Sequence, residues 1–209
     1  MKIVIPARKG SKGLPFKNRM LFNKTADIIP EDMKGFTYVL TDDAEIIKMA
    51  EDYGFNIIVR PYTISQDETS TKEAMEYFLN MMMFGPNEDI VMLYLTYPER
   101  TWEDVIRAHK FVWEHNAHSM LCKKELDTSP FLMMKEEDNN KGSQLFYHDL
   151  YRRQDYPKCF EISHFISIFR ASELNKLNNN LYNRRTMFME IQNNIIDVDT
   201  QHDLDKLDK

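Results

Sequence analysis

The sequence is poor in cysteine and contains no long hydrophobic run. Its two cysteines, Cys122 and Cys159, lie far apart and outside any CxxC motif, so neither a disulfide scaffold nor a thiolate metal site is expected. No apolar stretch approaches the roughly 20 residues that a membrane-spanning helix needs. The first residues do not form a charged segment followed by a hydrophobic core and a cleavage site, as a secretory signal would. We therefore expect a reduced, cytoplasmic protein with no membrane contact.

An excess of positive charge is also missing. Lys and Arg number 27 against 33 Asp and Glu, which gives a formal net charge of −6. An acidic surface repels a phosphate backbone, so we expect no binding to nucleic acid; this does not exclude a single nucleotide in a locally basic pocket. The 209 residues, 43% hydrophobic and 29% charged, have the composition of an ordinary globular protein. We expect a single domain over residues 1–209.

Strand-like and helix-like patterns alternate over the first 126 residues. Short runs rich in β-branched residues predict strands, and apolar residues at helical spacing predict helices. The expected strands cover residues 1–6, 36–40, 56–59, 89–95 and 119–123, and the expected helices cover residues 44–53, 70–84 and 101–115. Thr101 and Asp104 have the spacing of a capping box, and Gly54 is placed to end the first of these helices. The alternation predicts an α/β fold with a mostly parallel central sheet.

The regular alternation then breaks. Residues 130–158 contain a hairpin-like segment with its turn at Asp138–Gly142, and we expect this stretch to be an excursion from the sheet. Further on we expect a strand at 160–169, a short helix from Ser172, a strand-like run at 193–199 and a polar helix at the end. Pro30 interrupts the segment between Asn18 and Thr41 that should cross over to the second strand, which predicts a shortened first helix.

The first expected strand opens into a loop that combines glycine with positive charge. The loop, residues 6–18, reads PARKGSKGLPFKN and holds the cations Arg8, Lys12 and Lys17 with the glycines Gly10 and Gly13. Glycines let backbone N–H groups approach an anion closely, and ligands of open α/β sheets bind beyond the carboxyl ends of the strands. We therefore expect a polyphosphate here. The spacing matches neither GxxxxGK[ST] nor GxGxxG, which argues against a P-loop ATPase and a dinucleotide-binding protein.

Residues 5–18, IPARKGSKGLPFKN, resemble the signature of the acylneuraminate and related 3-deoxy-sugar cytidylyltransferases. Five further blocks follow in the family's order: TDD at 41–43, RP at 60–61 with DETST at 67–71, TYPERT at 96–101, RQDYP at 153–157 and DVDT at 197–200. The resemblance implies a Rossmann-like nucleotide-diphospho-sugar transferase fold and a homodimer in which residues 130–158 reach the partner subunit. It also implies that CTP reacts with the anomeric hydroxyl of an N-acylneuraminate, a sialic-acid-like 2-keto sugar acid, with release of pyrophosphate and help from Mg²⁺.

The resemblance implies roles for individual residues. The triphosphate would be held by Arg8, Ser11, Lys12, Lys17 and Asn18, and the cytidine by Arg60, Thr69 and Thr71. Mg²⁺ would bind Asp197 and Asp199, which lie two apart, so that both carboxylates point the same way in an extended segment. The catalytic set would be Arg8, Lys12, Lys17, Asp197 and Asp199, because cations stabilise the charge that grows on the leaving pyrophosphate. Arg153 would meet the acceptor's carboxylate with its guanidinium fork.

The sequence departs from the family pattern on the acceptor side. Tyr94 stands where the family has a glutamine, Leu132 where a lysine is expected, and SHFIS at 163–167 replaces the usual NGAIY. The acceptor-binding candidates are Tyr94, Arg153 and Ser167, and the identity of the sugar acid stays open. One alternative is a 3-deoxy-manno-octulosonate cytidylyltransferase. An alternative of another class is a non-catalytic nucleotide- or sugar-binding relative.

Histidine gives two weaker signals. His164 lies in the altered strand and could serve as a base, but a histidine on a half-buried strand more often only takes part in a hydrogen bond. His115 and His118 lie at a helix end with no thiol or further ligand nearby in sequence. A solvated helix terminus is therefore a better interpretation of them than a metal pair.

Overall fold

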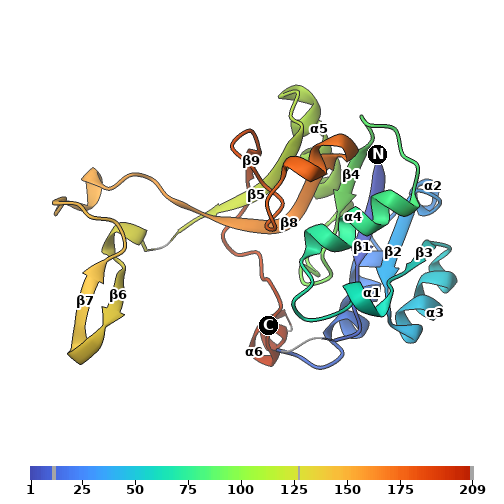
Figure 1. Ribbon diagram of the computed structural model, residues 1–209, viewed down its shortest axis with the longest axis horizontal. Coiled ribbons are helices and arrows are strands. Elements are labelled where there is room, and N and C mark those ends of the chain that lie inside the picture. The colour runs from blue at the N-terminus through green and yellow to red at the C-terminus, as the bar shows by residue number, and fades with distance from the viewer. Residues whose placement is uncertain (11–12, 127, 208–209) are drawn as a thin grey trace.

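A seven-stranded sheet forms the centre of the protein, whose computed structural model describes residues 1–10, 13–126 and 128–207 (Figure 1). In spatial order its strands are β3 (Asn56–Val59), β2 (Thr37–Thr41), β1 (Lys2–Pro6), β4 (Asp89–Met92), β8 (Phe160–Arg170), β5 (Ser119–Glu125) and β9 (Met187–Glu190). Neighbours pair in parallel except at β8, which runs antiparallel to both β4 and β5. The prediction of an α/β fold with a mostly parallel sheet is confirmed.

The helices cover both faces of this sheet. They are α1 (Lys17–Ala26), α2 (Glu31–Lys34), α3 (Ala44–Tyr53), α4 (Thr71–Met81), α5 (Trp102–Glu114) and α6 (Gln201–Leu207), with 3-10 helices at Tyr62–Ile64, Pro130–Leu132, Asp138–Asn140, Arg153–Asp155 and Ala171–Lys176. The capping box of Thr101 and Asp104 is present, and Gly54 ends α3 with a φ of 75°, a backbone conformation that favours glycine. No helix in the described part of the chain is long and apolar enough to cross a membrane.

Side chains of β1 alternate between two apolar cores, one on each face of the sheet. Ile3 and Ile5 pack in the core that holds the buried faces of α1, α3 and α5, while Val4 packs in the core under α4. All three side chains are fully buried. Burial on both faces accounts for the continuous apolar pattern of the strand, and it leaves the loop after Pro6 anchored at a rigid edge.

The crossover from β1 to β2 is short and broken, as predicted. Helix α1 has ten residues, and Pro30 lies between it and the single turn of α2, where Pro30 is the N-cap. Proline fits this position because the N-cap needs no helical N–H donor. The crossover therefore starts directly in the basic loop, with Lys17 as its first helical residue.

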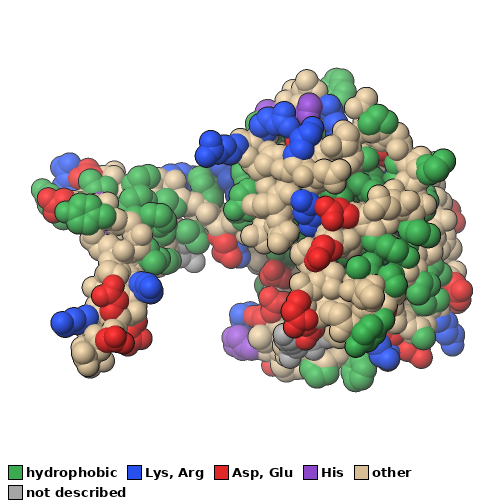
Figure 2. Space-filling model, viewed as in Figure 1, with side chains coloured by type: hydrophobic (Ala, Val, Ile, Leu, Met, Phe, Trp, Pro, Cys, Tyr) green, Lys and Arg blue, Asp and Glu red, His purple; other side chains and the backbone are tan. Residues whose placement is uncertain are grey.

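A hairpin stands away from the sheet, at the place where the sequence predicts an excursion (Figure 1). It consists of β6 (Met134–Glu137) and β7 (Lys141–Gln144), paired antiparallel. We use the term arm for residues 128–158, which include this hairpin. The arm exposes a series of large apolar side chains (Figure 2), and these are Leu132, Met133, Met134, Leu145, Phe146, Tyr147, Leu150 and Tyr151.

Two sequence-based assignments in the sheet are wrong, and one strand was missed. Strand β4 ends at Met92 instead of Leu95, because its pairing with β8 stops there, although Leu93 still donates its backbone N–H to Val4 of β1. The run 193–199 forms no strand; it touches the end of β4 through one bond, from the backbone N–H of Val198 to Thr96. Strand β9, which pairs with β5, was not predicted, since its four residues carry no clear alternating pattern.

Candidate active site

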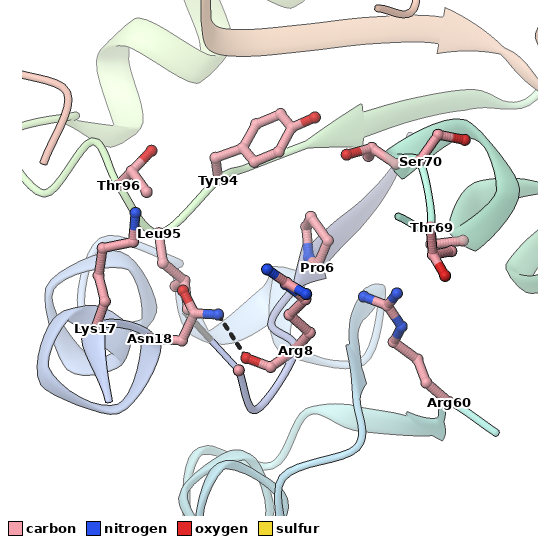
Figure 3. Close-up of a pocket in the computed structure, with 13 residues that line it drawn as sticks. Pro6, Arg8, Lys17, Asn18, Arg60, Thr69, Ser70, Tyr94, Leu95 and Thr96 are labelled. Atoms are coloured by element: carbon pink, nitrogen blue, oxygen red, sulfur yellow. Dashed lines mark hydrogen bonds between the residues drawn. The ribbon is translucent and has the colours of Figure 1, made fainter. Parts of the chain in front are cut away.

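A pocket opens where the basic loop, the end of β4 and the start of α4 come together (Figure 3). Among the residues that line it, seven were predicted from the sequence: Arg8, Lys17, Asn18, Arg60, Thr69, Thr71 and Tyr94. Pro6, Gly10, Ser70, Ala74, Leu95 and Thr96 complete the lining. The pocket lies at the carboxyl ends of β1 and β4, the edge at which open α/β sheets bind ligands.

The basic loop folds around its own backbone. The side-chain amide of Asn18 donates to the carbonyl of Arg8 at 2.8 Å, which ties the start of α1 to the end of β1. The guanidinium of Arg8 pairs with the carboxylate of Asp67, and the backbone N–H of Lys9 donates to Asp42 at 2.7 Å. The predicted phosphate ligands Ser11 and Lys12 lie outside the described residues.

Arg60 brings a second guanidinium into the pocket from the end of β3. Its backbone N–H donates to Thr41, its side chain is 6% exposed, and one of its terminal nitrogens donates to the carbonyl of Ile64. Its Nε is buried with no partner among the described residues. Burial lowers the pKa of Arg60, and the nearby charge of Arg8 lowers it further, against the opposing effect of Asp42. In Figure 3 the guanidinium groups of Arg8 and Arg60 both point into the hollow below Tyr94.

Helix α4 presents its first turn to the same pocket. The hydroxyl of Ser70 accepts the backbone N–H of Glu73, and the carboxylate of Glu73 accepts the backbone N–H of Ser70, which completes a capping box. Thr69, Ser70 and Thr71 therefore line the pocket from a fixed helix start. A helix N-terminus favours negative charge, so this end of α4 adds to the positive potential from the two arginines.

The predicted metal ligands flank a buried residue. Val198 is fully buried, whereas Asp197 and Asp199 are exposed on either side of it. The carboxylate of Asp199 accepts from the ammonium of Lys17 at 2.6 Å. A Cβ added at Gly13 would lie 2.4 Å from the carbonyl oxygen of Asp199, so only glycine allows the basic loop to come this close. The loop and the 197–199 segment thus meet beside the pocket.

Tyr94 lines the pocket opposite the basic loop, and further aromatic side chains pack behind it. The rings of Tyr94 and His164 lie edge to face, with centroids 5.4 Å apart, and the hydroxyl of Ser163 donates to that of Tyr97 at 3.4 Å. Burial raises the pKa of Tyr94 to about 12, and it raises that of Tyr97 as well. Burial lowers the pKa of His164, although the charge of Asp197 opposes this. These groups are therefore neutral at physiological pH.

Two of the three acceptor candidates do not line this pocket. Ser167 is 1% exposed, and its hydroxyl lies 3.4 Å from Nδ1 of His164 within the same strand, β8. Arg153 lies on the arm, in a second pocket that it shares with Leu132, Tyr156 and Cys159. Within one chain, only Tyr94 of the acceptor candidates reaches the pocket of Arg8.

The sequence motifs contain site residues to which no role was assigned. Asp67 and Asp42 hold the basic loop, and Tyr97 and Arg100 lie under the aromatic side. Each of these four residues lies inside one of the motifs TDD, DETST and TYPERT, and this position in a motif was the feature of the sequence that could have indicated a role. Their contacts join segments far apart in the chain, so no local spacing could indicate them.

Comparison with known proteins finds similarity to cytidylyltransferases, although no family model matches the chain. It is 25% identical over 210 residues to an N-acylneuraminate cytidylyltransferase of Streptococcus agalactiae, covering 96% of this chain and 50% of that protein. It is 24% identical over 216 residues to post-translational flagellin modification protein B of Campylobacter coli, covering 95% and 89%. The chain thus spans about half the length of the streptococcal relative.

Solved structures show the fold. The chain superposes on CMP:2-keto-3-deoxy-manno-octonic acid synthetase in complex with CTP with a TM-score of 0.68 at 16% identity, covering 99% of this chain and 95% of that one. It superposes on 4-diphosphocytidyl-2C-methyl-D-erythritol synthase of Anaerococcus prevotii with a TM-score of 0.64 at 13% identity, covering 100% and 99%. The resemblance inferred from the motifs is confirmed: in sequence the chain is similar to N-acylneuraminate cytidylyltransferases over nearly its whole length, and it has the cytidylyltransferase fold.

Proposed function

We propose that this protein is a cytidylyltransferase that joins CMP from CTP to a sialic-acid-like 2-keto sugar acid and releases pyrophosphate. One observation carries the proposal: a single pocket gathers Arg8, Lys17, Asn18, Arg60, Thr69 and Thr71 from segments up to 63 residues apart, and these are the residues that the motifs assign to CTP. Two guanidinium groups, an ammonium and a helix N-terminus suit a polyphosphate.

The triphosphate is the part of CTP that the basic loop suits. Arg8 and Lys17 already contact carboxylates, of Asp67 and Asp199, and phosphate oxygens would replace these carboxylates as partners. Both cations would then stabilise the negative charge that grows on the departing pyrophosphate, and Lys12 of the same loop completes the proposed set. Thr69 and Thr71 would face the cytidine from the first turn of α4.

Asp197 and Asp199 are the residues that would hold Mg²⁺. Their donor set fits the ion, because Mg²⁺ commonly binds through one or two carboxylates and completes its shell with water and substrate phosphates. No third Asp, Glu, His or Cys forms a metal-binding group with them in the described part of the chain. When bound, the ion would screen the phosphate charge and acidify the attacking hydroxyl.

The reaction exchanges one phosphorus–oxygen bond for another. The anomeric hydroxyl of the sugar acid attacks the α-phosphorus of CTP, a new oxygen–phosphorus bond forms, and the bond to the β-phosphate oxygen breaks. The electron pair leaves with pyrophosphate, and the hydroxyl proton passes to solvent. Burial keeps the pKa of His164 low, so this imidazole would be neutral and able to accept a proton. The protein's main contribution is to orient both substrates and stabilise the leaving group.

The acceptor is proposed to be an N-acylneuraminate. The similarity to the streptococcal and campylobacter proteins supports this choice, and the structural similarity to the octonic acid synthetase makes 3-deoxy-manno-octulosonate the second candidate. Tyr94 brings an aromatic ring to the position of the family's glutamine, so the shape of the accepted sugar is expected to differ from the family's common one.

We also propose a homodimer working in the cytoplasm. The arm carries Arg153 and Leu132 away from the pocket of their own chain, and it exposes apolar side chains such as Phe146 and Tyr151. A second copy would bury this surface and receive Arg153 beside its own acceptor. Light scattering at micromolar concentration tests the dimer, and a monomer would contradict it.

Pyrophosphate release tests the proposed activity. The purified protein is incubated with CTP and Mg²⁺ and with each acid of a panel: N-acetylneuraminate, its bacterial relatives and 3-deoxy-manno-octulosonate. We expect release with one N-acylneuraminate, and none when EDTA removes the metal or when ATP replaces CTP. CTP binding by calorimetry without release from any acid would instead favour the non-catalytic binding protein.

A further inference from the structure

Arg100 is the largest fully buried side chain of the described core, and none of the proposed steps uses it. It lies between the end of β4 and the start of α5 and is 2% exposed. None of the described carboxylates lies within ion-pairing distance, since the nearby Asp104 is engaged in the capping box and with Arg107. A buried cation without a counter-ion is costly, so its geometry calls for an explanation.

The guanidinium bridges two strands at the point where they separate. Strands β4 and β8 pair as far as Met92 and Ser167, and in that register the residues two steps further on are Tyr94 and Phe165. Arg100 donates from Nη1 to the carbonyl of Phe165 and from Nη2 to the carbonyl of Tyr94, each at 2.6 Å. Two carbonyls cannot bond each other, so a forked donor occupies the gap between the strand ends.

The bridge needs an arginine in its charged form. Burial lowers the pKa of Arg100 to about 10, so the group still carries its charge at neutral pH. Charge-assisted hydrogen bonds to both carbonyls offset part of the cost of burial. A lysine would keep the charge but has no planar fork, and it could not reach both carbonyls in the same geometry.

One of the two bridged residues lines the pocket, and the other lies behind it in the core. Tyr94 lines the pocket itself, and Phe165 is adjacent to His164, whose ring meets that of Tyr94. Phe165 also packs edge to face against Tyr97, with ring centroids 5.7 Å apart. The separation of Tyr94 from His164 therefore follows from the width of the guanidinium that holds their strands apart.

We propose that Arg100 is a positioning residue that sets the acceptor side of the pocket without touching either substrate. This inference rests on the proposed function. The nucleotide side depends on the basic loop, β3 and α4, and Arg100 forms no hydrogen bond with the described residues of these elements. Its approach to α1 is a 3.5 Å contact with Thr25. Loss of the bridge should therefore change the binding of the sugar acid and leave the binding of CTP unchanged.

The test is Arg100→Lys, with Arg107→Lys as the matched control. Arg107 is an exposed arginine of α5 that pairs with Asp104, so its exchange should change neither KM. For Arg100→Lys we expect the KM of the best acid in the panel to rise about tenfold or more, while the KM of CTP stays within about twofold. Equal changes in both constants, or a loss of kcat alone, would mean a purely structural role and would overturn the inference.

Two further measurements keep the test decisive if the lysine variant does not fold. Arg100→Gln keeps two amide N–H donors. It is likewise expected to raise the KM of the acid and to leave that of CTP nearly unchanged. In the wild-type protein, hydrogen exchange should slow at residues 93–97 and 163–167 when N-acetylneuraminate, or the acid that is turned over, is added to the CMP-saturated protein. CMP alone should slow exchange at residues 60–71 instead. If the acid slows hydrogen exchange at neither of these two strand ends, the inference is overturned even if pyrophosphate is released. Absence of pyrophosphate release, in contrast, contradicts only the proposed function.

Discussion

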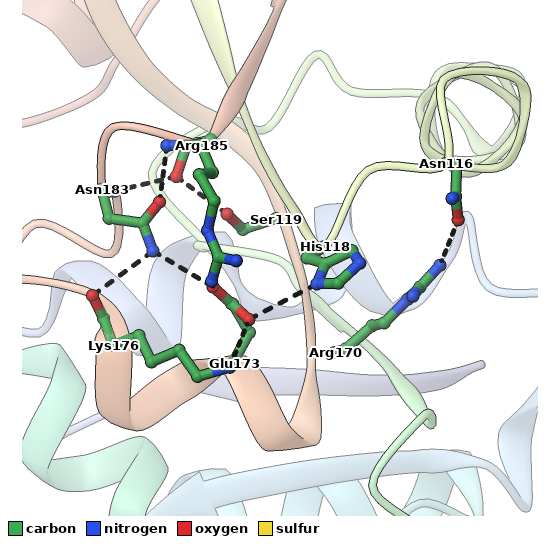
Figure 4. A network of polar contacts seen from close by, with 9 residues as sticks. Asn116, His118, Ser119, Arg170, Glu173, Lys176, Asn183 and Arg185 are labelled. Carbon is green, nitrogen blue, oxygen red and sulfur yellow. Dashed lines mark hydrogen bonds and ion pairs between the residues drawn. The ribbon is translucent and has the colours of Figure 1, made fainter.

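Two clusters of opposite charges lie on different parts of the molecule and are built in opposite ways. In the cluster around Glu173 (Figure 4), one carboxylate, 1% exposed, accepts from Arg185 at 2.6 Å, Lys176 at 3.1 Å and Asn183 at 3.2 Å. In the pocket (Figure 3), the cations Arg8 and Lys17 each contact one carboxylate at the rim. The first cluster is an acid enclosed by donors, and the second is a group of donors around a hollow.

We expect the cluster around Glu173 to contribute to stability and the cluster in the pocket to contribute to activity. The groups around Glu173 use their hydrogen bonds on one another and thereby close the turns between residues 171 and 186 onto the sheet. The pocket instead keeps donors that a phosphate can recruit, and the buried Arg60 has a nitrogen with no partner among the described residues. Substitution in the first cluster should lower the melting temperature, and substitution in the second should lower turnover.

The largest effect is expected from Arg8→Ala. Removing this guanidinium takes away a donor at the departing pyrophosphate, and we expect kcat to fall by about 10² to 10³-fold while the melting temperature stays nearly constant. Lys9→Ala is the matched control, because Lys9 lies in the same loop and its side chain is exposed. Steady-state pyrophosphate release and a thermal melt check both parts. A variant that melts early but turns over normally would remove the distinction between the clusters.

Asp199→Asn should come next. The amide keeps the size of the side chain but loses the charge that would hold Mg²⁺, so turnover in Mg²⁺ should fall by about a hundredfold. CTP binding by calorimetry should persist, because Lys17 is released from its ion pair and remains available to phosphate. Asp205→Asn, an exposed acid of α6, serves as the control. Unchanged turnover would remove the metal assignment.

A smaller effect, on stability alone, is expected from Glu173→Gln. Burial by itself would raise the pKa of Glu173, but the hydrogen bonds from Lys176, Asn183 and Arg185 hold it below its ordinary value. The folded state is therefore stabilised above the unfolded pKa of about 4.3, and this contribution is lost as the pH falls through the folded pKa. We expect a loss of about 2 kcal/mol at pH 7 that shrinks in acid, with no change in either KM.

Thermal melts from pH 7 down to pH 3 measure this difference. Glu31→Gln is the control, since Glu31 pairs with Lys34 on the surface and is 88% exposed, so its exchange should hardly change the melting temperature. A wild-type advantage that grows in acid would contradict the role given to Glu173.

The nucleotide side of the site could be predicted because it depends on local sequence. Arg8, Lys17 and Asn18 belong to one loop that follows a strand, and a strand end of a parallel sheet is a known ligand position. The alternation of strands and helices likewise depends on short-range periodicity, so α3 was predicted over 44–53, its bounds in the structure.

The acceptor side could not be predicted in the same way. The residues proposed for it come from the end of β4, from β8 and from the 197–199 segment, and β8 enters the sheet antiparallel between strands that precede it in the chain. The carbonyls bridged by Arg100 are 71 residues apart, and no spacing in the sequence indicates such a pair. Strand β9 shows the same limit, since its place beside β5 is set by tertiary packing.

Arg153 belongs to neither cluster, and its substitution is expected to have the smallest effect. This substitution tests whether the pocket needs a residue from outside the part of the chain that lines it. If Arg153 binds the acceptor's carboxylate, Arg153→Ala should raise the KM of the sugar acid by about tenfold and leave that of CTP nearly unchanged. The adjacent Arg152, which pairs with Asp155 on the arm, provides the control as Arg152→Ala. Equal effects on both constants would contradict the role of Arg153.

Mixing the Arg153→Ala and Arg8→Ala variants then decides which pocket Arg153 serves, provided that the acid is kept well below its wild-type KM, where both variants are impaired. Within its own chain Arg153 lines a different pocket from Arg8, so in a dimer an Arg153→Ala subunit would keep an intact basic loop and an Arg8→Ala subunit an intact arm. If the arm completes the partner's site, dissociated and reassociated mixtures should regain about a quarter of wild-type turnover, because half of the dimers would be mixed and each would hold one whole site. If each arm serves its own chain, no mixed dimer contains a whole site, and the mixture should stay as inactive as its parts.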